Sequence, residues 1–161
     1  MIYIGIDPGK GGGLAFLREG IHTSVKLLRF SEIGVAPMPD TETDIAELLE
    51  EWVVDEECCA VLEQVNAMPK QGVTSSFNFG RNYGFIRGCL ISFGVPFQEA
   101  VPRKWMKGLG IRTRKKTETS SQWKNFLKGA AQQHFGNAAP KLTLKTCDAL
   151  LIAEYCWRTN R

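Results

Sequence analysis

Short apolar runs alternate with longer amphipathic stretches along this chain. The apolar runs predict five β-strands, at 2–6, 14–17, 23–28, 58–63 and 95–100. The run at 58–63 is small and apolar up to its last residue, which is typical of a strand that is covered on both faces. The stretch 30–40 contains Pro37 and Pro39, and we expect it to be irregular.

Apolar residues at helical spacing predict five helices, over 43–53, 75–90, 102–107, 119–134 and 144–157. Thr43 is the expected cap of the first helix, and Ser75 or Ser76 is the expected start of the second. The second helix also carries glycines four residues apart. Glycine lowers helix stability, so close packing on a sheet or on a partner would compensate. Three strands followed by alternating helices and strands predict a single domain over 1–161, with a mixed α/β sheet.

The composition narrows the class of protein. Hydrophobic residues make up 43% of the 161 residues and charged residues 23%, as in a soluble globular domain. No run approaches the roughly 18 apolar residues of a membrane span, and no basic segment precedes the first strand as in a signal peptide. The five cysteines form no C-x-x-C pair. We therefore expect reduced thiols in a cytoplasmic protein rather than a disulfide framework or a zinc site.

Charge is distributed unevenly along the chain. Residues 1–100 contain seven Lys or Arg and fourteen Asp or Glu, whereas residues 101–161 contain thirteen and three. The acidic run 40–57 fits the solvated face of a helix. The basic run 103–128 has nine basic residues and one acid, Glu118. An excess of one sign over this length favours a polyanionic partner such as nucleic acid.

Three carboxylates lie at the ends of apolar elements. Asp7 ends the first strand, Glu63 ends the fourth, and Asp148 opens the last apolar helical run. If the first and fourth strands are parallel neighbours, Asp7 and Glu63 lie side by side, and a helix that crosses their ends adds Asp148. Carboxylate oxygens in this arrangement suit Mg²⁺ or Mn²⁺. Two such ions can promote phosphodiester cleavage by activating a water and stabilising the leaving oxygen.

Each acid also has a simpler interpretation. Asp-Pro-Gly at 7–9 is a common turn signal, Glu63 can be a surface residue at a strand end, and Asp148 can be favoured by the helix dipole. The glycines after Asp7 match neither nucleotide-binding pattern. G-x-G-x-x-G requires glycine where Leu14 stands, and the Walker pattern lacks its final Gly-Lys-Ser/Thr. The metal-site hypothesis therefore depends on the coincidence of all three acids.

Three segments resemble the motifs of RuvC-type Holliday junction resolvases, namely Ile4–Gly9, Glu63–Val65 and Asp148–Ala153. Their order and spacing match over essentially the whole chain, and the loop at 71–81 resembles variants found in phages and in plant chloroplasts. The resemblance implies an RNase H-like fold, a homodimer, and Mg²⁺-dependent symmetric nicking of four-way DNA junctions. It implies that the acids of the three motifs bind the metal and act in catalysis. The first motif alone is shared with actin-like ATPases, whereas the three together are fairly specific.

One position departs from the pattern of this family. The family usually has a further acid or a histidine one helical turn before the last aspartate, and Lys145 stands there in this chain. A protonated lysine cannot bind a metal, so we expect the site to hold one ion less firmly. Lys145 is instead a candidate fourth catalytic residue that contacts the scissile phosphate or the attacking water as a point charge. An exposed lysine without a role is the alternative.

Candidate DNA contacts follow from the basic residues. Phosphate contacts set affinity and salt dependence, and we expect them from Lys70, Arg81, Arg103, Lys104, Lys107, Arg112, Arg114, Lys115 and Lys116. In relatives the loop after Glu63 enters the junction, so Phe77 and Phe79 are candidates for stacking on opened bases. Core packing is the alternative for both phenylalanines. We expect Trp105, Trp123 and Trp157 in the core or in dimer contacts.

Three other functions remain open on the sequence alone. A nuclease of the same fold can act on other branched DNA, such as forks or flaps. A junction-binding protein without catalysis would account for Lys145. An actin-like or sugar-kinase ATPase would share the glycine-rich turn after Asp7, but such enzymes need a second nucleotide-binding half, and 161 residues are too few for one.

Overall fold

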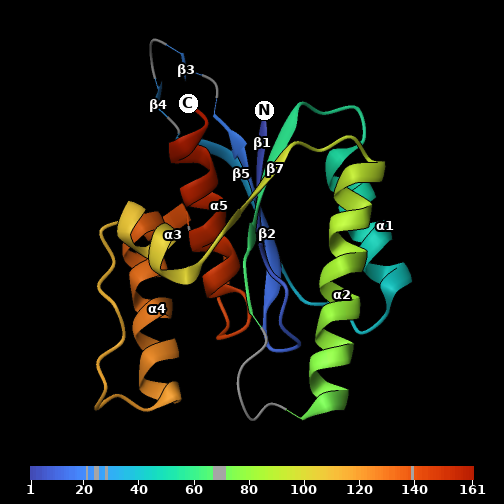
Figure 1. The fold of residues 1–161 in the computed structure, drawn as a ribbon. Helices are drawn as coiled ribbons and strands as arrows, with labels where there is room; N and C mark the ends of the chain where they lie inside the picture. The colour runs from blue at the N-terminus through green and yellow to red at the C-terminus, as the bar shows by residue number, and fades with distance from the viewer. Residues whose placement is uncertain (21, 24–25, 28, 67–71, 139) are drawn as a thin grey trace.

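The computed structural model describes the chain except for residues 21, 24–25, 28, 67–71 and 139. Its centre is a five-stranded sheet in the order β5-β2-β1-β6-β7 (Figure 1). The strands are β1 (Ile2–Asp7), β2 (Gly13–Glu19), β5 (Phe30–Pro37), β6 (Cys58–Glu63) and β7 (Phe97–Ala100). β2 runs antiparallel to both β1 and β5, whereas β1, β6 and β7 are parallel. The expected mixed α/β sheet of five strands is confirmed.

One strand of the sheet differs from the expectation. β5 covers the stretch that we expected to be irregular, and it pairs with β2 at the edge of the sheet. Proline is tolerated on an edge strand, so Pro37 can be the last residue of β5 while the strand still pairs with β2. The expected strand at 23–28 is wrong, because its described residues belong to the two-residue strands β3 (His22–Thr23) and β4 (Lys26–Leu27), which pair with each other. The remaining residues of that stretch lie outside the described part of the chain.

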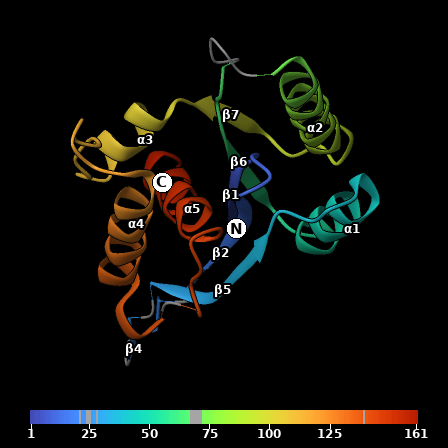
Figure 2. The ribbon, with the colours of Figure 1, turned by 90° about the horizontal axis from the view of Figure 1, so that it is seen from below.

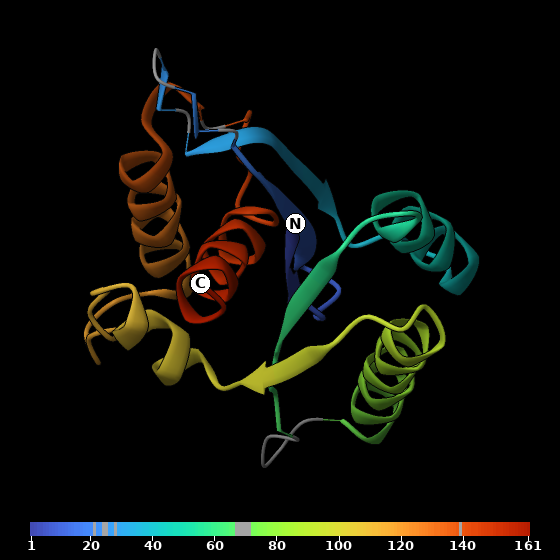
Figure 3. The same cartoon turned by 90° about the horizontal axis from the view of Figure 1, so that it is seen from above.

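Helices cover both faces of the sheet (Figures 2 and 3). They are α1 (Glu42–Val53), α2 (Val73–Ser92), α3 (Pro102–Gly108), α4 (Ser120–Phe135) and α5 (Cys147–Thr159), with a short 3-10 helix at Gly136–Ala138. Side chains alternate between the faces of a strand. Ile2, Ile4 and Ile6 of β1 therefore pack with α1 and α2, whereas Tyr3 packs with α3, α4 and α5. β1 is buried on both faces.

Three helices begin at positions other than those expected. Thr41 caps α1 by accepting a hydrogen bond from Asp44 N (3.1 Å), two residues before the expected cap. α2 begins at Val73, also two residues early. α5 begins at Cys147 rather than near 144. By contrast, α4 begins as expected after Thr119, whose side chain and backbone form a capping box.

α5 lies directly on β1 at Gly5. A Cβ atom added to Gly5 would lie 2.2 Å from the carbonyl oxygen of Ala149 and 2.2 Å from the backbone nitrogen of Ala153. Because any larger residue would collide with the helix backbone, glycine is required for this close approach. The contact carries the first turn of α5 to the carboxyl end of β1.

The cysteines and the helices add two further facts. All five cysteines carry free thiols, of which Cys89, Cys147 and Cys156 are buried. The thiols of Cys59 and Cys156 share a hydrogen bond, with 3.6 Å between the sulfur atoms, rather than a disulfide. Within the described residues, no helix has the length and apolarity to cross a bilayer.

Candidate metal centre

Two of the three predicted acids end neighbouring parallel strands. Ile6 of β1 pairs in register with Leu62 of β6. The next residues, Asp7 and Glu63, therefore lie side by side at the carboxyl ends of these two strands. The third acid, Asp148, is the second residue of α5, and the packing of α5 on β1 carries it to the same strand ends. Asp7 and Asp148 are buried, and Glu63 is partly buried. The structure thus brings the three predicted acids together.

Burial and mutual repulsion raise the pKa values of two of these acids. Burial, followed by the charge of Asp148, raises the pKa of Asp7 to about 6, although Lys124 opposes the shift. Burial, followed by the charge of Asp7, raises the pKa of Glu63 to about 8, against a hydrogen bond from Trp105. Groups that shift one another's pKa lie within range of one another's charge. The centre therefore holds three carboxyl groups close to one another in a partly dehydrated place.

The glycine-rich turn after β1 surrounds Asp7. Gly9 N donates to Asp7 Oδ1 (3.3 Å), and a Cβ atom added to Gly12 would lie 2.5 Å from Asp7 Cγ. A side chain at Gly12 would collide with the carboxylate, so the turn can close on Asp7 only with glycine there. The close contact with Asp7 is sufficient to explain the glycine at position 12, and no bound phosphate is needed to account for it.

Lys124 of α4 supplies positive charge at the centre. Its Nζ donates to Asp148 Oδ2 (2.5 Å) and lies 3.7 Å from Asp7 Oδ2. Burial alone would lower the pKa of Lys124, but Asp148 and Asp7 hold that pKa above its ordinary value. The lysine is therefore charged. Glu63 has a different partner, because Trp105 Nε1 of α3 donates to Glu63 Oε1 (2.9 Å).

The donor set fits a divalent cation. Three carboxylates offer only oxygen ligands, which Mg²⁺ and Mn²⁺ prefer. The Lys124 ammonium already occupies a cation position beside two of them. Across the described residues, no three His, Cys, Asp or Glu side chains are close enough in this arrangement to share a metal ion. Coordination of one ion by all three acids would therefore draw their side chains closer together.

Lys124 is not among the site residues predicted from the sequence, and Trp105 is predicted only as a core or dimer residue. Leu127, Ala131 and Phe135 form the buried stripe of α4, and Lys124 precedes Leu127 by three residues on the same face. A lysine at the start of an apolar stripe was the signal that could have identified a buried charge. Trp105 is buried as expected, but nothing in the sequence indicates that its N–H donates to an acid of the centre.

Lys145, the candidate fourth catalytic residue, is not part of α5. It lies in the turn before the helix, and its side chain is exposed. Because α5 begins at Cys147, the argument that a helical turn places Lys145 on the face of Asp148 does not hold for this chain. The lysine that reaches the acids is Lys124. A contact between Lys145 and a phosphate stays a prediction.

Six of the predicted phosphate-contacting residues are exposed on α3 and in the loop that follows it, namely Arg103, Lys104, Lys107, Arg114, Lys115 and Lys116. The opposite face of α3 carries Trp105, which contacts Glu63. Exposed positive charge therefore lies on the same short helix that touches the carboxylates.

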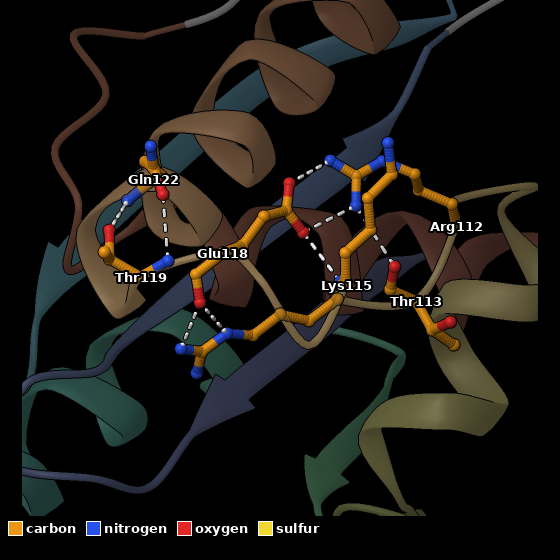
Figure 4. A network of polar contacts seen from close by, with 7 residues as sticks. Arg112, Thr113, Lys115, Glu118, Thr119 and Gln122 are labelled. Atoms are coloured by element: carbon orange, nitrogen blue, oxygen red, sulfur yellow. Dashed lines mark hydrogen bonds and ion pairs between the residues drawn. The ribbon is translucent and has the colours of Figure 1, made fainter.

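Arg112 and Arg114 have partners inside the loop between α3 and α4 (Figure 4). Arg112 Nη1 and Nη2 donate to the two carboxylate oxygens of Glu118 (2.9 and 2.5 Å), and its guanidinium lies 4.0 Å from the ring centroid of Phe126. Arg114 Nη2 donates to the Glu118 carbonyl (2.7 Å), and Lys115 N donates to Glu118 Oε2 (2.7 Å). The single acid of the basic run thus holds the loop in shape, and phosphate contacts by these arginines would compete with those bonds.

The predicted stacking residues lie on α2. Phe77 is 69% exposed, so core packing is wrong for this side chain. Phe79 is partly buried and stacks on Tyr83, with ring centroids 6.1 Å apart.

Of the two predicted phosphate contacts outside the basic run, Arg81 pairs with Glu42 of α1 (3.1 Å). The remaining predicted contact, Lys70, lies outside the described residues.

A cleft of about 890 Å³ adjoins the candidate centre. The turn after Asp7, the start of α1 and the first half of α2 line it, with Lys10 and Arg81 among the lining residues. Asn82 of α2 donates to the Pro8 carbonyl (3.0 Å) at its wall. The cleft places an open, polar space next to the residue that follows Asp7.

Comparison with solved structures identifies the fold. The chain is similar to Thermus thermophilus RuvC, with a TM-score of 0.62 and 18% sequence identity over 99% of this chain and 96% of that chain. It is also similar to T. thermophilus RuvC in complex with a Holliday junction substrate, with a TM-score of 0.63 and 16% identity over 99% and 97% of the two chains. No protein-family model matches the sequence, and no curated protein matches it. The chain therefore has the RuvC fold, which is RNase H-like.

Proposed function

We propose that this chain is a Mg²⁺-dependent endonuclease of the RuvC type that resolves four-way DNA junctions as a homodimer. The convergence of Asp7, Glu63 and Asp148 at one edge of the sheet supports the proposal most. A fold alone does not define an activity, whereas buried acids with raised pKa values are typical of a functional site. T. thermophilus RuvC, which shares the fold, is known in complex with a Holliday junction substrate. We place the enzyme in the cytoplasm of a bacterium or a phage-infected host, and a phage origin stays a hypothesis.

In this mechanism the three acids hold Mg²⁺, with Mn²⁺ as a substitute. The bound ion supplies Lewis-acid stabilisation of the phosphate and a more acidic attacking water. Each of the three acids interacts with the charges of the other two, so they form one set. Trp105 fixes Glu63 through Oε1 and leaves Oε2 for a ligand. The low exposure of Asp7 and Asp148 weakens solvent screening, which strengthens their interactions with a cation.

The surroundings of the centre suit a DNA backbone. Exposed basic residues on α3 and in the following loop offer phosphate contacts on one side. The cleft beside Asp7 offers space on the other, although its lining balances Lys10 and Arg81 with Asp40 and Glu42. Phosphate contacts position DNA without reading its sequence, so this arrangement fits selection of DNA by shape.

A cleavage assay on a synthetic four-way junction tests the proposal. We expect paired, symmetric nicks in Mg²⁺ and in Mn²⁺. Ca²⁺ is expected to support binding without cleavage, because its larger and more flexible coordination shell does not reproduce the octahedral geometry of Mg²⁺. Equal rates on forks and flaps would favour the alternative nuclease of branched DNA.

Two other outcomes would replace the proposal. Salt-dependent junction binding without nicking at any Mg²⁺ or Mn²⁺ concentration would indicate a junction-binding protein. Stabilisation on heating by ATP would favour the ATPase alternative, since a bound ligand raises the stability of the folded state.

The exposed face of α2 supports the homodimer. Cβ atoms added to Gly80, Gly84 or Gly88 would meet nothing within 4 Å, so packing on the sheet does not require these glycines. Val73 and Phe77, which are 87% and 69% exposed, precede them on the same face at helical spacing. Each interior glycine costs about 1 kcal/mol of helix stability relative to alanine. A second copy of the chain that packs closely on this face would offset that cost.

Gly84→Leu is expected to disrupt the homodimer without unfolding the protomer. Its side chain would enter open space in the protomer but would overpack the interface, at a cost of about 1–3 kcal/mol. That cost corresponds to about a 5- to 150-fold weaker dimer, measurable by analytical ultracentrifugation. Gly129→Leu on α4, where an added Cβ also meets nothing within 4 Å, is the matched control. A Gly84→Leu protein that dimerises like the wild type would rule out this face.

A further inference from the structure

α4 lies beside α5 (Figure 2), and the side chain of Lys124 on α4 reaches Asp148 on α5. The buried stripe of α4 continues with Leu127, Ala131 and Phe135. Only 33% of the Lys124 side chain is exposed. A lysine in such a place loses hydration and side-chain freedom, so it requires strong partners.

Its partners are two of the predicted metal ligands. Lys124 Nζ is 2.5 Å from Asp148 Oδ2 and 3.7 Å from Asp7 Oδ2, so the ammonium touches both carboxylates from one position. Among the residues that the structure describes, no other basic side chain pairs with Asp7, Glu63 or Asp148. Lys124 is therefore the cation that holds Asp7 and Asp148 together.

A divalent ion between the same oxygens would compete with this lysine. Mg²⁺ binds carboxylate oxygens at about 2.1 Å, and Lys124 Nζ is 2.5 Å from one of them. An ammonium and a divalent ion this close repel each other strongly in a partly buried place. The two cations cannot both hold Asp148 Oδ2 in the present arrangement without a large electrostatic cost.

We propose that Lys124 is a built-in competitor of the metal, and that the Lys124–Asp148 ion pair must open before a divalent ion binds. The lysine thereby tunes the metal affinity of the centre and keeps the acids in place until the ion arrives. This inference rests on the proposed metal-dependent function. It concerns the order of cation exchange at the centre and is separate from any contact that Lys124 makes with DNA.

The test compares Lys124→Met with Lys128→Met in the full chain. Methionine keeps an unbranched apolar stem and removes the charge, and Lys128 lies one helical turn further along α4 without an ion pair to the acids. Mg²⁺ binding is measured by titration calorimetry without DNA, at constant ionic strength. We expect Lys124→Met to bind Mg²⁺ about tenfold more tightly, equal to about 1.4 kcal/mol, and Lys128→Met to match the wild type.

Thermal unfolding provides a second measurement. In EDTA, Lys124→Met is expected to unfold at a lower temperature than Lys128→Met, because Asp7 and Asp148 lose their shared cation. Saturating Mg²⁺ is expected to reduce this difference, since the ion replaces the lost charge. A larger difference in Mg²⁺ than in EDTA would contradict competition.

A third measurement uses the wild-type protein, so it does not depend on the folding of a variant. An amine-acetylating reagent labels exposed lysines, and mass spectrometry gives the extent of labelling at each one. We expect Lys124 to be protected in EDTA and labelled more at saturating Mg²⁺, with Lys128 labelled equally in both.

The possible results separate this inference from the proposed function. If Mg²⁺ neither binds nor stabilises any of the proteins, the proposed metal centre fails and the inference fails with it. If Mg²⁺ binds but Lys124→Met shows equal or weaker affinity, the inference is overturned and the nuclease proposal stands. Unchanged acetylation of Lys124 at saturating Mg²⁺ overturns it in the same way.

Discussion

Asp7→Asn is expected to abolish cleavage of a four-way junction and to leave junction binding intact. Asparagine keeps the shape of the side chain and can still accept the hydrogen bond from Gly9 N, but it carries no charge for a metal. Loss of an outer-shell partner of a metal site costs roughly 10–100-fold in affinity or activity. Loss of a ligand itself should cost more than about 100-fold, and single-turnover cleavage in Mg²⁺ measures it.

Binding should survive because other residues provide it. The exposed basic residues of α3 lie outside the carboxylate set, and a neutral residue at position 7 removes negative charge that repels DNA. A mobility shift on the same junction in Ca²⁺ measures this part. Glu47→Gln, on the exposed face of α1, is the control for loss of one negative charge elsewhere. Cleavage by Asp7→Asn at the wild-type rate would refute the metal centre.

The sheet shows how far hydrophobic pattern alone leads. β1 and β6 are short and apolar, and their sequence pattern predicts buried strands correctly. Their parallel pairing places Asp7 beside Glu63 as expected. β5 is an edge strand with exposed Ser31 and Glu32 and a terminal proline. Its pattern resembles that of a loop because one partner strand, rather than an apolar sequence, stabilises it. Pairing of this kind becomes visible only when the partner is known.

The candidate centre also has a part that the sequence predicts and a part that it does not. Its three acids each follow or open an apolar element, so the sequence marks them. Lys124 and Trp105 reach the acids from α4 and α3, and both contacts join residues at least 24 positions apart in the chain. The approach of α5 likewise depends on Gly5, whose importance appears only when the helix is seen against it. The apolar stripe of α4 could mark Lys124 as a buried charge, but no local pattern identifies the partner of a long-range side-chain contact.

The raised pKa values predict opposite effects of pH with and without metal. The pKa of Glu63 is about 8 instead of 4.5, and that of Asp7 is about 6 instead of 3.8. A carboxyl whose pKa is raised by folding stabilises the protein below its unfolded pKa and loses that contribution as pH rises through the folded pKa. In EDTA the free energy of unfolding should therefore fall between about pH 4 and pH 8. One pKa unit is worth about 1.4 kcal/mol, so the loss is on the order of several kcal/mol.

Mg²⁺ should reverse this trend, because it binds the ionised carboxylates and releases their protons. The increase in unfolding temperature caused by Mg²⁺ is expected to grow from pH 5 to pH 8, as Asp7 and then Glu63 lose the protons that compete with the ion. Glu63→Gln keeps an oxygen that accepts from Trp105 Nε1 but cannot titrate. In EDTA this variant should lose the part of the pH dependence that lies between about pH 6 and pH 8, which urea unfolding at each pH measures. If Glu63→Gln and the wild type change equally over that range, Glu63 does not sit protonated in the metal-free centre, and another group must cause the destabilisation.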